Sequence, residues 1–549
     1  MDRARHLRNY DLHSWSGLAL GLFVYVICFS GSIALFHHEI LSWEDPAKRM
    51  TVADAPVAMN DTFVEWVRSN SDKQTVQFAR FTFPTTYEPY FVGGMTVEDE
   101  NGKSEFIEQR WDTASGEALP ERGDGLSEWL LDFHRDLMWP EGLGGRTAGR
   151  TIVGIIGIVL MLSILTGVIA HTKIFQELFT LRYLRSVRLK WQDTHKVLGL
   201  WGLPFYTMIA FTGAFLGVVA ILSPLVALLT FKGDQEALIA AVLGEPLEAT
   251  GEAAEMISVD ALKNLSLSDS DAPVWFVVMN HYGDANARFD VYFKPDTELT
   301  SVEGFQIDGV SGARIEDSSL ENLTAANRVI NALSPLHYGT YGGIALKFVY
   351  LALGLSLSVI TALGLMMWVE RRLHGSTGDR SQSVYRLIGR IATGATAGLP
   401  LATAALFIHD KLYAGPESAR LFWTGATYFG IWAVPIAYAF LRRNDYGVTR
   451  EILALTGAIL VGAPFVNTTV TGASLFDAFS GSHRVAGFVD VTLLLLGAIT
   501  ILIASQLPAR RAAETRGRIV TAPDGVTQDD AVQGNAAIDG QTKLAVPAE

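Results

Sequence analysis

Long apolar runs alternate with polar segments along this chain, and they fall into two groups of four. The first group occupies residues 18–35, 151–170, 197–229 and 348–369, and the second 391–408, 421–441, 452–470 and 485–506. Each run can cross most or all of about 30 Å of hydrocarbon as a helix that rises about 1.5 Å per residue. The pattern therefore predicts a mainly α membrane protein with eight transmembrane helices.

Two polar loops interrupt the first group, at residues 44–133 and 232–335, and both are predicted to fold as α+β units. The first has a helical pattern at 60–69, alternating strands at 76–83 and 89–97, and a hairpin signal at 111–117. The second has a short helix at 259–265, strands at 275–279 and 288–293, and a turn at 294–297. The shared order of elements indicates an internal duplication.

Basic residues are concentrated at one set of span ends. Arg3, Arg5 and Arg8 precede the first span, and further clusters lie after the second, fourth, sixth and eighth spans. Because cytoplasmic loops of membrane proteins are enriched in Lys and Arg, this side is predicted to be cytoplasmic, with both termini inside. The first apolar run is too long for a cleaved signal peptide. We therefore expect a multi-pass protein of a bacterial inner membrane.

Acidic residues are concentrated on the other side. Residues 44–133 contain 18 Asp and Glu against 8 Lys and Arg, and residues 232–335 contain 18 against 6. The two loops thus sum to −10 and −12, or −22, against −14 for the whole chain. This charge excludes nucleic acid as a partner, because phosphate would be repelled. The simplest interpretation is that it solvates two extracytoplasmic domains.

The predicted organisation has seven parts. They are the cytoplasmic N-terminus and first span (1–43), the first α+β insertion (44–133), spans two and three (134–231), the second insertion (232–335), the fourth span (336–373), the last four spans (374–508) and a disordered cytoplasmic tail (509–549). The single cysteine, Cys28, lies in the first span, so a disulfide framework and a cysteine metal cluster are both excluded.

Four of the 12 histidines stand at two levels of the predicted bundle. His13 and His195 lie at the cytoplasmic start of spans one and three, and His134 and His337 lie at the outer approach to spans two and four. Histidines at matched depths on neighbouring helices suit axial ligation of haem iron. We therefore expect two b-type haems, one at each level, within the first four spans.

Glycines recur at fixed distances from these histidines. His13 is followed by Gly17 and Gly31, and His195 by Gly199 and Gly213, at intervals of four and eighteen residues in both cases. Four and eighteen residues are about one and five helical turns, so the three residues share one stripe. Gly167 and Gly364 follow His134 and His337 in the second and fourth spans. Such a stripe offers a ligand and a flat wall for a macrocycle, although glycine in membrane helices also serves close helix packing.

Other histidines compete for these roles. His171 lies at the inner end of span two and is the alternative inner ligand, and His37, at the outer end of span one, is the alternative outer ligand. His409 and His483 flank spans five and eight on the outer side and could hold a third haem.

Several motifs make residues 5 to about 373 resemble the PepSY-associated transmembrane family. They are Leu12–Gly17, Phe29–Ser32, Phe36–Glu39, Phe133–Leu137, Leu165–Gly167, Trp191–His195, Phe211–Gly213 and Leu336–Gly339, with a PepSY-like hairpin at Asp112–Glu117 and a turn at Pro295–Glu298. That second turn has Thr297-Glu298 where the family has Thr-Gly. The last four spans lie outside the resemblance, and their role stays open.

The resemblance implies a four-span haem core with exported PepSY domains. Members include inner-membrane reductases that release iron from ferric siderophores, and by analogy His13, His195, His134 and His337 would be the axial ligands. The chain has no GxGxxG or GxxxxGK[ST] nucleotide signature, so a separate flavoprotein or quinol is the expected electron donor. A ferric siderophore or other ferric chelate is the expected acceptor.

Two other classes of function predict different chemistry. PepSY domains also occur as inhibitors or regulators of peptidases, and a haem-free membrane regulator would not need paired histidines at two depths. A transporter would need broken helices and charged residues at mid-membrane, and the first four spans contain almost none.

Overall fold

The computed structural model describes most of the chain outside the C-terminal tail. The described residues are 3–71, 76–85, 88–98, 104–120, 125–171, 174–180, 182, 187–235, 237, 248–266, 272–293, 299, 303–317, 325–375, 379–442, 445–472, 475 and 484–507. The predicted turn at 294–297, His483 and the tail lie outside them.

Eight helices within the described residues are long and apolar enough to cross a membrane, as predicted. They are α1 (Arg3–Ala34), α5 (Gly145–Ala170), α8 (Leu203–Thr230), α12 (Gly343–Gly375), α13 (Asp379–Leu412), α14 (Arg420–Arg442), α15 (Asp445–Thr471) and α16 (Arg484–Gln506). Large apolar side chains such as Leu441 and Leu229 are 81% and 75% exposed on their outer faces. Exposing so much apolar surface to water would be unfavourable, whereas lipid solvates it. The chain is therefore a multi-pass membrane protein.

Shorter helices prolong or flank these spans. α2 (His37–Glu44) and α4 (Leu126–Asp136) lie between α1 and α5, and α11 (Ala325–Tyr338) precedes α12. The predicted third span divides into α7 (Val187–Trp201) and α8, because Pro204 near the start of α8 cannot donate a backbone hydrogen bond to the preceding turn. Each half of the first group therefore consists of a span, an insertion, a short helix and a second span.

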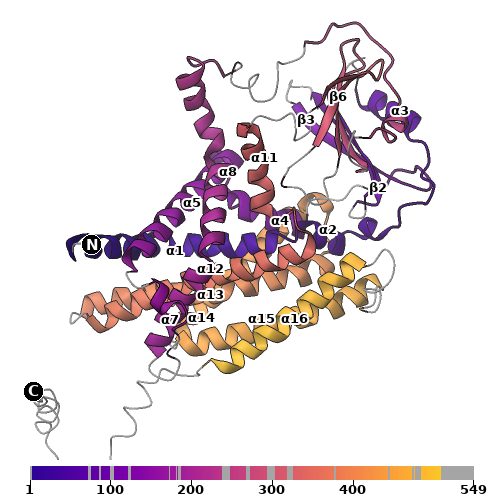
Figure 1. Ribbon diagram of the computed structural model, residues 1–549. Helices are drawn as coiled ribbons and strands as arrows, with labels where there is room; N and C mark the ends of the chain where they lie inside the picture. Colours follow the sequence, from indigo (N-terminus) through magenta and orange to yellow (C-terminus); the bar gives the residue numbers. More distant parts are fainter. Residues whose placement is uncertain are drawn as a thin grey trace, which may run out of the picture.

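The two insertions together form one seven-stranded antiparallel sheet in the order β3-β2-β1-β4-β5-β6-β7 (Figure 1). The strands are β1 (Val76–Thr82), β2 (Tyr90–Glu98), β3 (Ser104–Asp112), β4 (Val274–Tyr282), β5 (Arg288–Phe293), β6 (Glu303–Asp308) and β7 (Arg314–Asp317). The strands predicted from sequence are present. The sequence did not predict that β1 pairs with β4, which merges the insertions into one sheet with a continuous apolar core.

A short helix from each insertion caps the start of the other. The carboxylate of Asp260, in α10 (Val259–Leu262), accepts hydrogen bonds from the backbone N–H groups of Met59 and Asn60 at 2.8 and 3.0 Å. Asn60, the first residue of α3 (Asn60–Asn70), accepts in turn from the N–H of Val259 at 3.2 Å. Each helix start thus satisfies orphan N–H groups of the other, which the predicted duplication would produce.

The duplication also explains where the second hairpin turn lies. Asp112 accepts hydrogen bonds from the N–H and hydroxyl of Ser115, and Gly116 has a φ of 73°. Asp308 accepts the same two bonds from Ser311, ahead of Gly312 with a φ of 72°. The turn at 308–313 therefore repeats the hydrogen bonds of the first hairpin, whereas the predicted turn at 295–298 lies outside the described residues. The Asp-x-x-Ser-Gly spacing shared by both turns could have indicated this.

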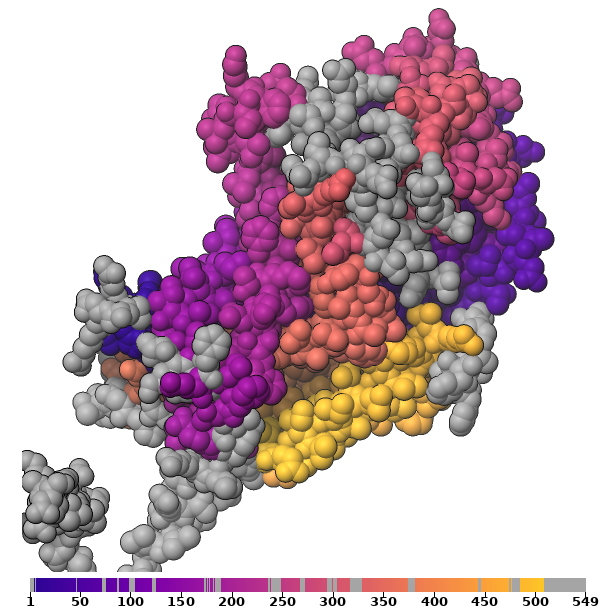
Figure 2. Space-filling view, in the orientation of Figure 1, coloured from indigo at the N-terminus to yellow at the C-terminus, as the bar shows by residue number. Residues whose placement is uncertain are grey.

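Three of the four C-terminal helices, α13, α15 and α16, contribute buried polar groups to a network around Trp43 of α2. The indole N–H of the fully buried Trp43 donates to Asp490 Oδ1 of α16 at 2.6 Å, and Asn467 of α15 donates to Oδ2 at 2.9 Å. Lys411 Nζ of α13 donates to the Trp43 carbonyl at 2.9 Å and lies 3.9 Å from the centre of its ring. Figure 2 shows these C-terminal helices along one flank of the helical body, with the inserted segments at one end.

Asp490→Ala should lower the free energy of unfolding by about 3 kcal/mol, because it leaves two buried donors unsatisfied. The measurement is the thermal unfolding midpoint in detergent, with Asp490→Asn as a matched variant that retains one acceptor and should fall between wild type and Asp490→Ala. Equal midpoints for all three proteins would show that this network does not stabilise the fold.

Candidate functional site

The four predicted histidines form two pairs at opposite ends of the first four spans. His13 of α1 and His195 of α7 have ring centres 6.1 Å apart, with ring planes inclined by 75°. His134 of α4 and His337 of α11 have ring centres 6.2 Å apart, with planes inclined by only 17°. The structure thus brings together the residues that the sequence assigned to the same level. We call them the inner pair and the outer pair.

The outer pair lies at the end of the bundle that carries the sheet. α4 and α11 connect the inserted segments to α5 and α12, and both lie between the long helices and the sheet in Figure 1. His13 lies near the start of α1, and His195 lies on α7, which precedes α8. The inner pair is therefore separated from the outer pair by most of the span length.

In every ring, Nδ1 hydrogen bonds to a neighbouring helix. His13 donates to the carbonyl of Ser163 at 2.9 Å, His134 to that of Ile27 at 3.0 Å and His195 to that of Ile360 at 2.9 Å. His337 Nδ1 lies 2.9 Å from Thr212 Oγ1, whose hydroxyl donates to the Met208 carbonyl at 2.8 Å. Because a carbonyl can only accept, Nδ1 carries the proton and Nε2 keeps its lone pair.

A glycine makes room for each ring. A Cβ at Gly31 would lie 2.6 Å from His134 Cε1, and one at Gly213 would lie 2.9 Å from His337 Cε1. At Gly167 the distance to His13 Cε1 would be 3.1 Å, and at Gly364 the distance to His195 Cε1 would be 3.5 Å. The sequence predicted a flat wall for a macrocycle at these glycines, but the structure gives each one a specific neighbour, the imidazole of the adjacent helix.

The glycines one turn after the inner histidines have different surroundings. At Gly17 and Gly199 a Cβ would have no atom within 4 Å. These two positions therefore leave open space beside His13 and His195, on the stripe where the sequence predicted contact with a flat ligand.

Burial keeps three imidazoles neutral, those of His134, His195 and His337, which lie on the short helices α4, α7 and α11. It lowers the pKa of His134 to about 4, and it lowers the pKa of His195 to about 4 with a further contribution from His13. Burial likewise lowers the pKa of His337 to about 3, assisted by His134. These rings are thus unprotonated at neutral pH, and only a neutral imidazole can bind a metal.

The spacing within each pair fits one metal ion between two imidazoles. A metal–imidazole bond is about 2 Å long and the ring centre lies about 1.2 Å beyond the nitrogen, so opposed rings have centres about 6.4 Å apart. The described residues contain no group of three or more His, Cys, Asp or Glu that could hold a metal ion. Two protein ligands suit a metal whose other ligands come from a macrocycle, as in haem.

The competing histidines lie in other surroundings. His37 Nε2 hydrogen bonds to Glu128 Oε1 at 2.9 Å, so this nitrogen is already engaged. His171 is the C-cap residue of α5, one turn beyond Gly167. His409 lies 3.2 Å from Thr427 Oγ1 through its Nδ1, and its predicted partner, His483, is outside the described residues.

Comparison with known proteins places this core in a family. The profile described as PepSY-associated TM region matches residues 10–371. The chain belongs to this family. The match contains both histidine pairs and the whole seven-stranded sheet, whereas α13–α16 lie beyond it.

The uncharacterized protein PA4219 of Pseudomonas aeruginosa is similar to this chain. The two are 28% identical over 405 residues, which cover 70% of this chain and 95% of that protein.

The acceptors of the histidine N–H groups were not found from the sequence. Three of the four are backbone carbonyls, which have no residue signature, although each lies four residues before the glycine that accommodates the same ring: Ile27 before Gly31, Ser163 before Gly167 and Ile360 before Gly364. Four residues is about one helical turn, so the carbonyl and the following glycine lie on the same face of the helix. Together they bind one imidazole ring, the carbonyl by a hydrogen bond and the glycine by leaving space for it.

Proposed function

We propose that this protein is a b-type dihaem cytochrome that carries electrons across the inner membrane to an acceptor on the sheet side. The observation that carries the proposal is that four histidines form two pairs at two depths. In each ring Nδ1 hydrogen bonds to a neighbouring helix, and in each pair the ring centres are about as far apart as bis-imidazole ligation requires. Outer partners of this kind fix the tautomer of metal-bound histidines in proteins.

Each residue type has a separate task in this proposal. His13 and His195 would hold the inner haem, and His134 and His337 the outer haem. Gly31, Gly213, Gly167 and Gly364 let each imidazole approach a neighbouring backbone, and Gly17 and Gly199 leave space beside the inner pair. When bound, two haems would supply one-electron Fe(III)/Fe(II) chemistry at two levels of a layer that ions cannot cross.

The proposed direction follows from the two ends of the bundle. The basic residues at the inner end indicate the cytoplasm, and the acidic insertions would then lie in the periplasm. A ferric siderophore or other ferric chelate is the favoured acceptor, on family analogy. Electron transfer to a bound chelate would be outer-sphere, so it needs access to the outer pair and no acid or base residue.

Spectroscopy of the purified protein tests the proposal. We expect sharp low-spin b-type absorption bands on dithionite reduction, two haems per chain by the pyridine haemochrome method, and reoxidation of both by a ferric siderophore. Protein without haem after expression in haem-replete cells would overturn the proposal and favour the haem-free regulator.

The two pairs should also differ in their electron paramagnetic resonance spectra. Near-perpendicular imidazoles give low-spin ferric haem a strongly anisotropic signal and near-parallel ones give a rhombic signal. The 75° and 17° inclinations therefore predict one signal of each kind. His13→Ala should remove the anisotropic signal and His134→Ala the rhombic one. Two identical signals would contradict the ring orientations described above.

A further inference from the structure

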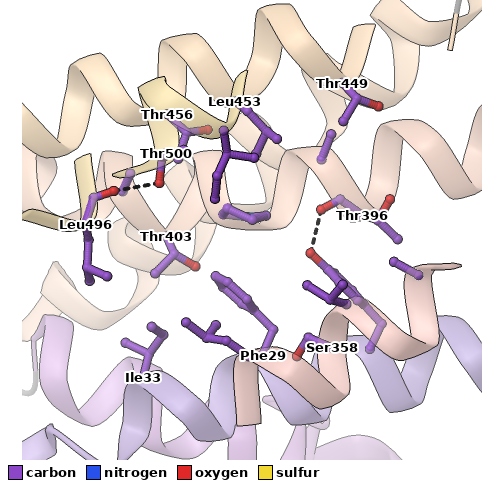
Figure 3. Close-up of a pocket in the computed structure, with 18 of the residues that line it drawn as sticks. Phe29, Ile33, Ser358, Thr396, Thr403, Thr449, Leu453, Thr456, Leu496 and Thr500 are labelled. Atoms are coloured by element: carbon purple, nitrogen blue, oxygen red, sulfur yellow. Dashed lines mark hydrogen bonds between the residues drawn. The ribbon is translucent and has the colours of Figure 1, made fainter. Parts of the chain in front are cut away.

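A long apolar groove lies between the family core and the C-terminal helices. It has a volume of about 560 Å³, within the usual range for small-molecule sites of about 300–1,000 Å³. Figure 3 shows Phe29 and Ile33 of α1 and Ser358 of α12 on one wall, facing Thr403 of α13 and Leu496 of α16 on the other. One wall of the groove thus comes from α1 and α12, which contact the histidine rings, and the other comes from helices that lie beyond the family match.

Threonine and serine hydroxyls are spread along the groove, whereas a carboxylate lies at its inner end. Midway, the Tyr25 hydroxyl donates to the Thr396 carbonyl at 2.6 Å. At the inner end Trp191 of α7 stacks on Tyr446 of α15, with ring centres 5.8 Å apart. Glu370 is the charged residue among the described residues that line the groove, and none of these is Lys or Arg.

This inner end adjoins the inner histidine pair. Trp191, which lines the groove, precedes His195 on α7 by four residues, or about one turn. On α12, Ile360 and Gly364 contact His195, whereas Val359, Leu363 and Met366 line the groove. A single helix, about 10 Å thick, therefore separates the groove from the inner pair.

We infer that this groove binds an isoprenoid quinol, with its ring at the inner end beside the stacked rings of Trp191 and Tyr446 and near Glu370, and its tail along the apolar walls. The inference rests on the proposed function, because it identifies the electron donor. Oxidation of one quinol to quinone breaks two O–H bonds and releases two electrons and two protons. The electrons leave singly toward the inner pair and reduce two ferric acceptors, and the protons pass by way of the Glu370 carboxylate to water at the inner face.

Charge distinguishes a quinol from a phospholipid as the occupant. A phosphate headgroup is bound in proteins by Lys, Arg or backbone N–H groups. The described lining contains no Lys or Arg side chain that could bind phosphate. A quinol ring is uncharged, donates two hydroxyl protons and stacks on aromatic side chains, and the inner end of the groove offers a partner for each property.

The first test measures binding and needs no haem. A photoreactive azidoquinone is irradiated with the purified full-length protein, and labelled peptides are mapped by mass spectrometry. We expect labelling in α12, α13, α15 or α16 that excess decylubiquinone suppresses. The groove-filling variant Ala362→Phe/Thr500→Phe should lose most of the label, whereas Val434→Phe, which enlarges a 60% exposed residue of α14 outside the groove, should keep it.

Two outcomes of this experiment would overturn the inference. One is labelling that phosphatidylethanolamine suppresses as well as decylubiquinone does, which would make the groove a lipid site. The other is equal labelling of the groove-filling variant and wild type, which would place the quinone elsewhere.

The second test measures electron entry. Decylubiquinol should reduce the haems of wild type and Val434→Phe, and it should reduce those of Ala362→Phe/Thr500→Phe at least tenfold more slowly, while dithionite reduces all three fully. Glu370→Gln should slow reduction by the quinol without weakening azidoquinone labelling. Undiminished quinol reduction in the groove-filling variant would refute the donor site. Absence of haem would refute the proposed function, and the labelling result would still decide whether the groove binds quinone.

Discussion

His134→Ala should reduce the haem content from two to one per chain. The substitution removes one of the two imidazoles that would hold the outer haem, and the ring of His337, 6.2 Å away, could not replace it. His337→Ala should cause the same loss, and the double variant should lose no more than either single one, because the two residues act on one site. The measurement is the pyridine haemochrome ratio of haem to protein, with the spectrum of the remaining haem.

The inner pair provides the complementary experiment. His13→Ala and His195→Ala should each remove the other haem, so His13→Ala/His134→Ala should contain none. His409→Ala is the matched control, because this histidine also lies near the end of a long helix but belongs to neither pair, and it should retain two haems. Loss of haem in the control, or retention of two haems in His134→Ala, would show that the pairs are not the ligands.

Gly31→Ala should also remove the outer haem, although it leaves all four histidines in place. The new methyl group would lie 2.6 Å from His134 Cε1, a distance that real Cβ contacts do not show. The ring cannot turn away without breaking its bond to the Ile27 carbonyl at 3.0 Å, one turn earlier on the same helix. We therefore expect about half of the wild-type haem content and loss of the signal assigned to the outer pair.

Gly430→Ala serves as the control for this experiment. It adds the same methyl group to a membrane helix at a site with no atom within 4 Å, so the haem content should not change. Gly213→Ala makes a second, independent test, because its methyl group would lie 2.9 Å from His337 Cε1 at the same level. Full haem content in both Gly31→Ala and Gly213→Ala would mean that these glycines only serve helix packing.

The proposed electron path also gives α13–α16 a defined task. These helices lie outside the family match, and they contribute one wall of the groove and the buried partners of Trp43. A four-span core therefore gains a site and an anchor from an added bundle. The anchor holds α2, which leads into the first half of the sheet, next to α4 and the outer pair.

Local patterns in the sequence determined the membrane helices, the two insertions and the four candidate histidines. Apolar runs long enough to cross a bilayer have few alternatives to a helix, because backbone groups in hydrocarbon must be satisfied within their own segment. The recurrence of His, Gly and a second Gly at intervals of four and eighteen residues also reflects a local property, the helical repeat.

Only the tertiary structure decided which residues meet. The pairing of β1 with β4 and the capping of α3 by Asp260 join segments about 200 residues apart. The contact of the His134 ring with Gly31 and the burial of Asp490 beside Trp43 also depend on the packing of distant elements. Spacing along one helix fixes which residues share its face, but the partner of that face is selected by shape, hydrogen bonding and burial over the whole fold.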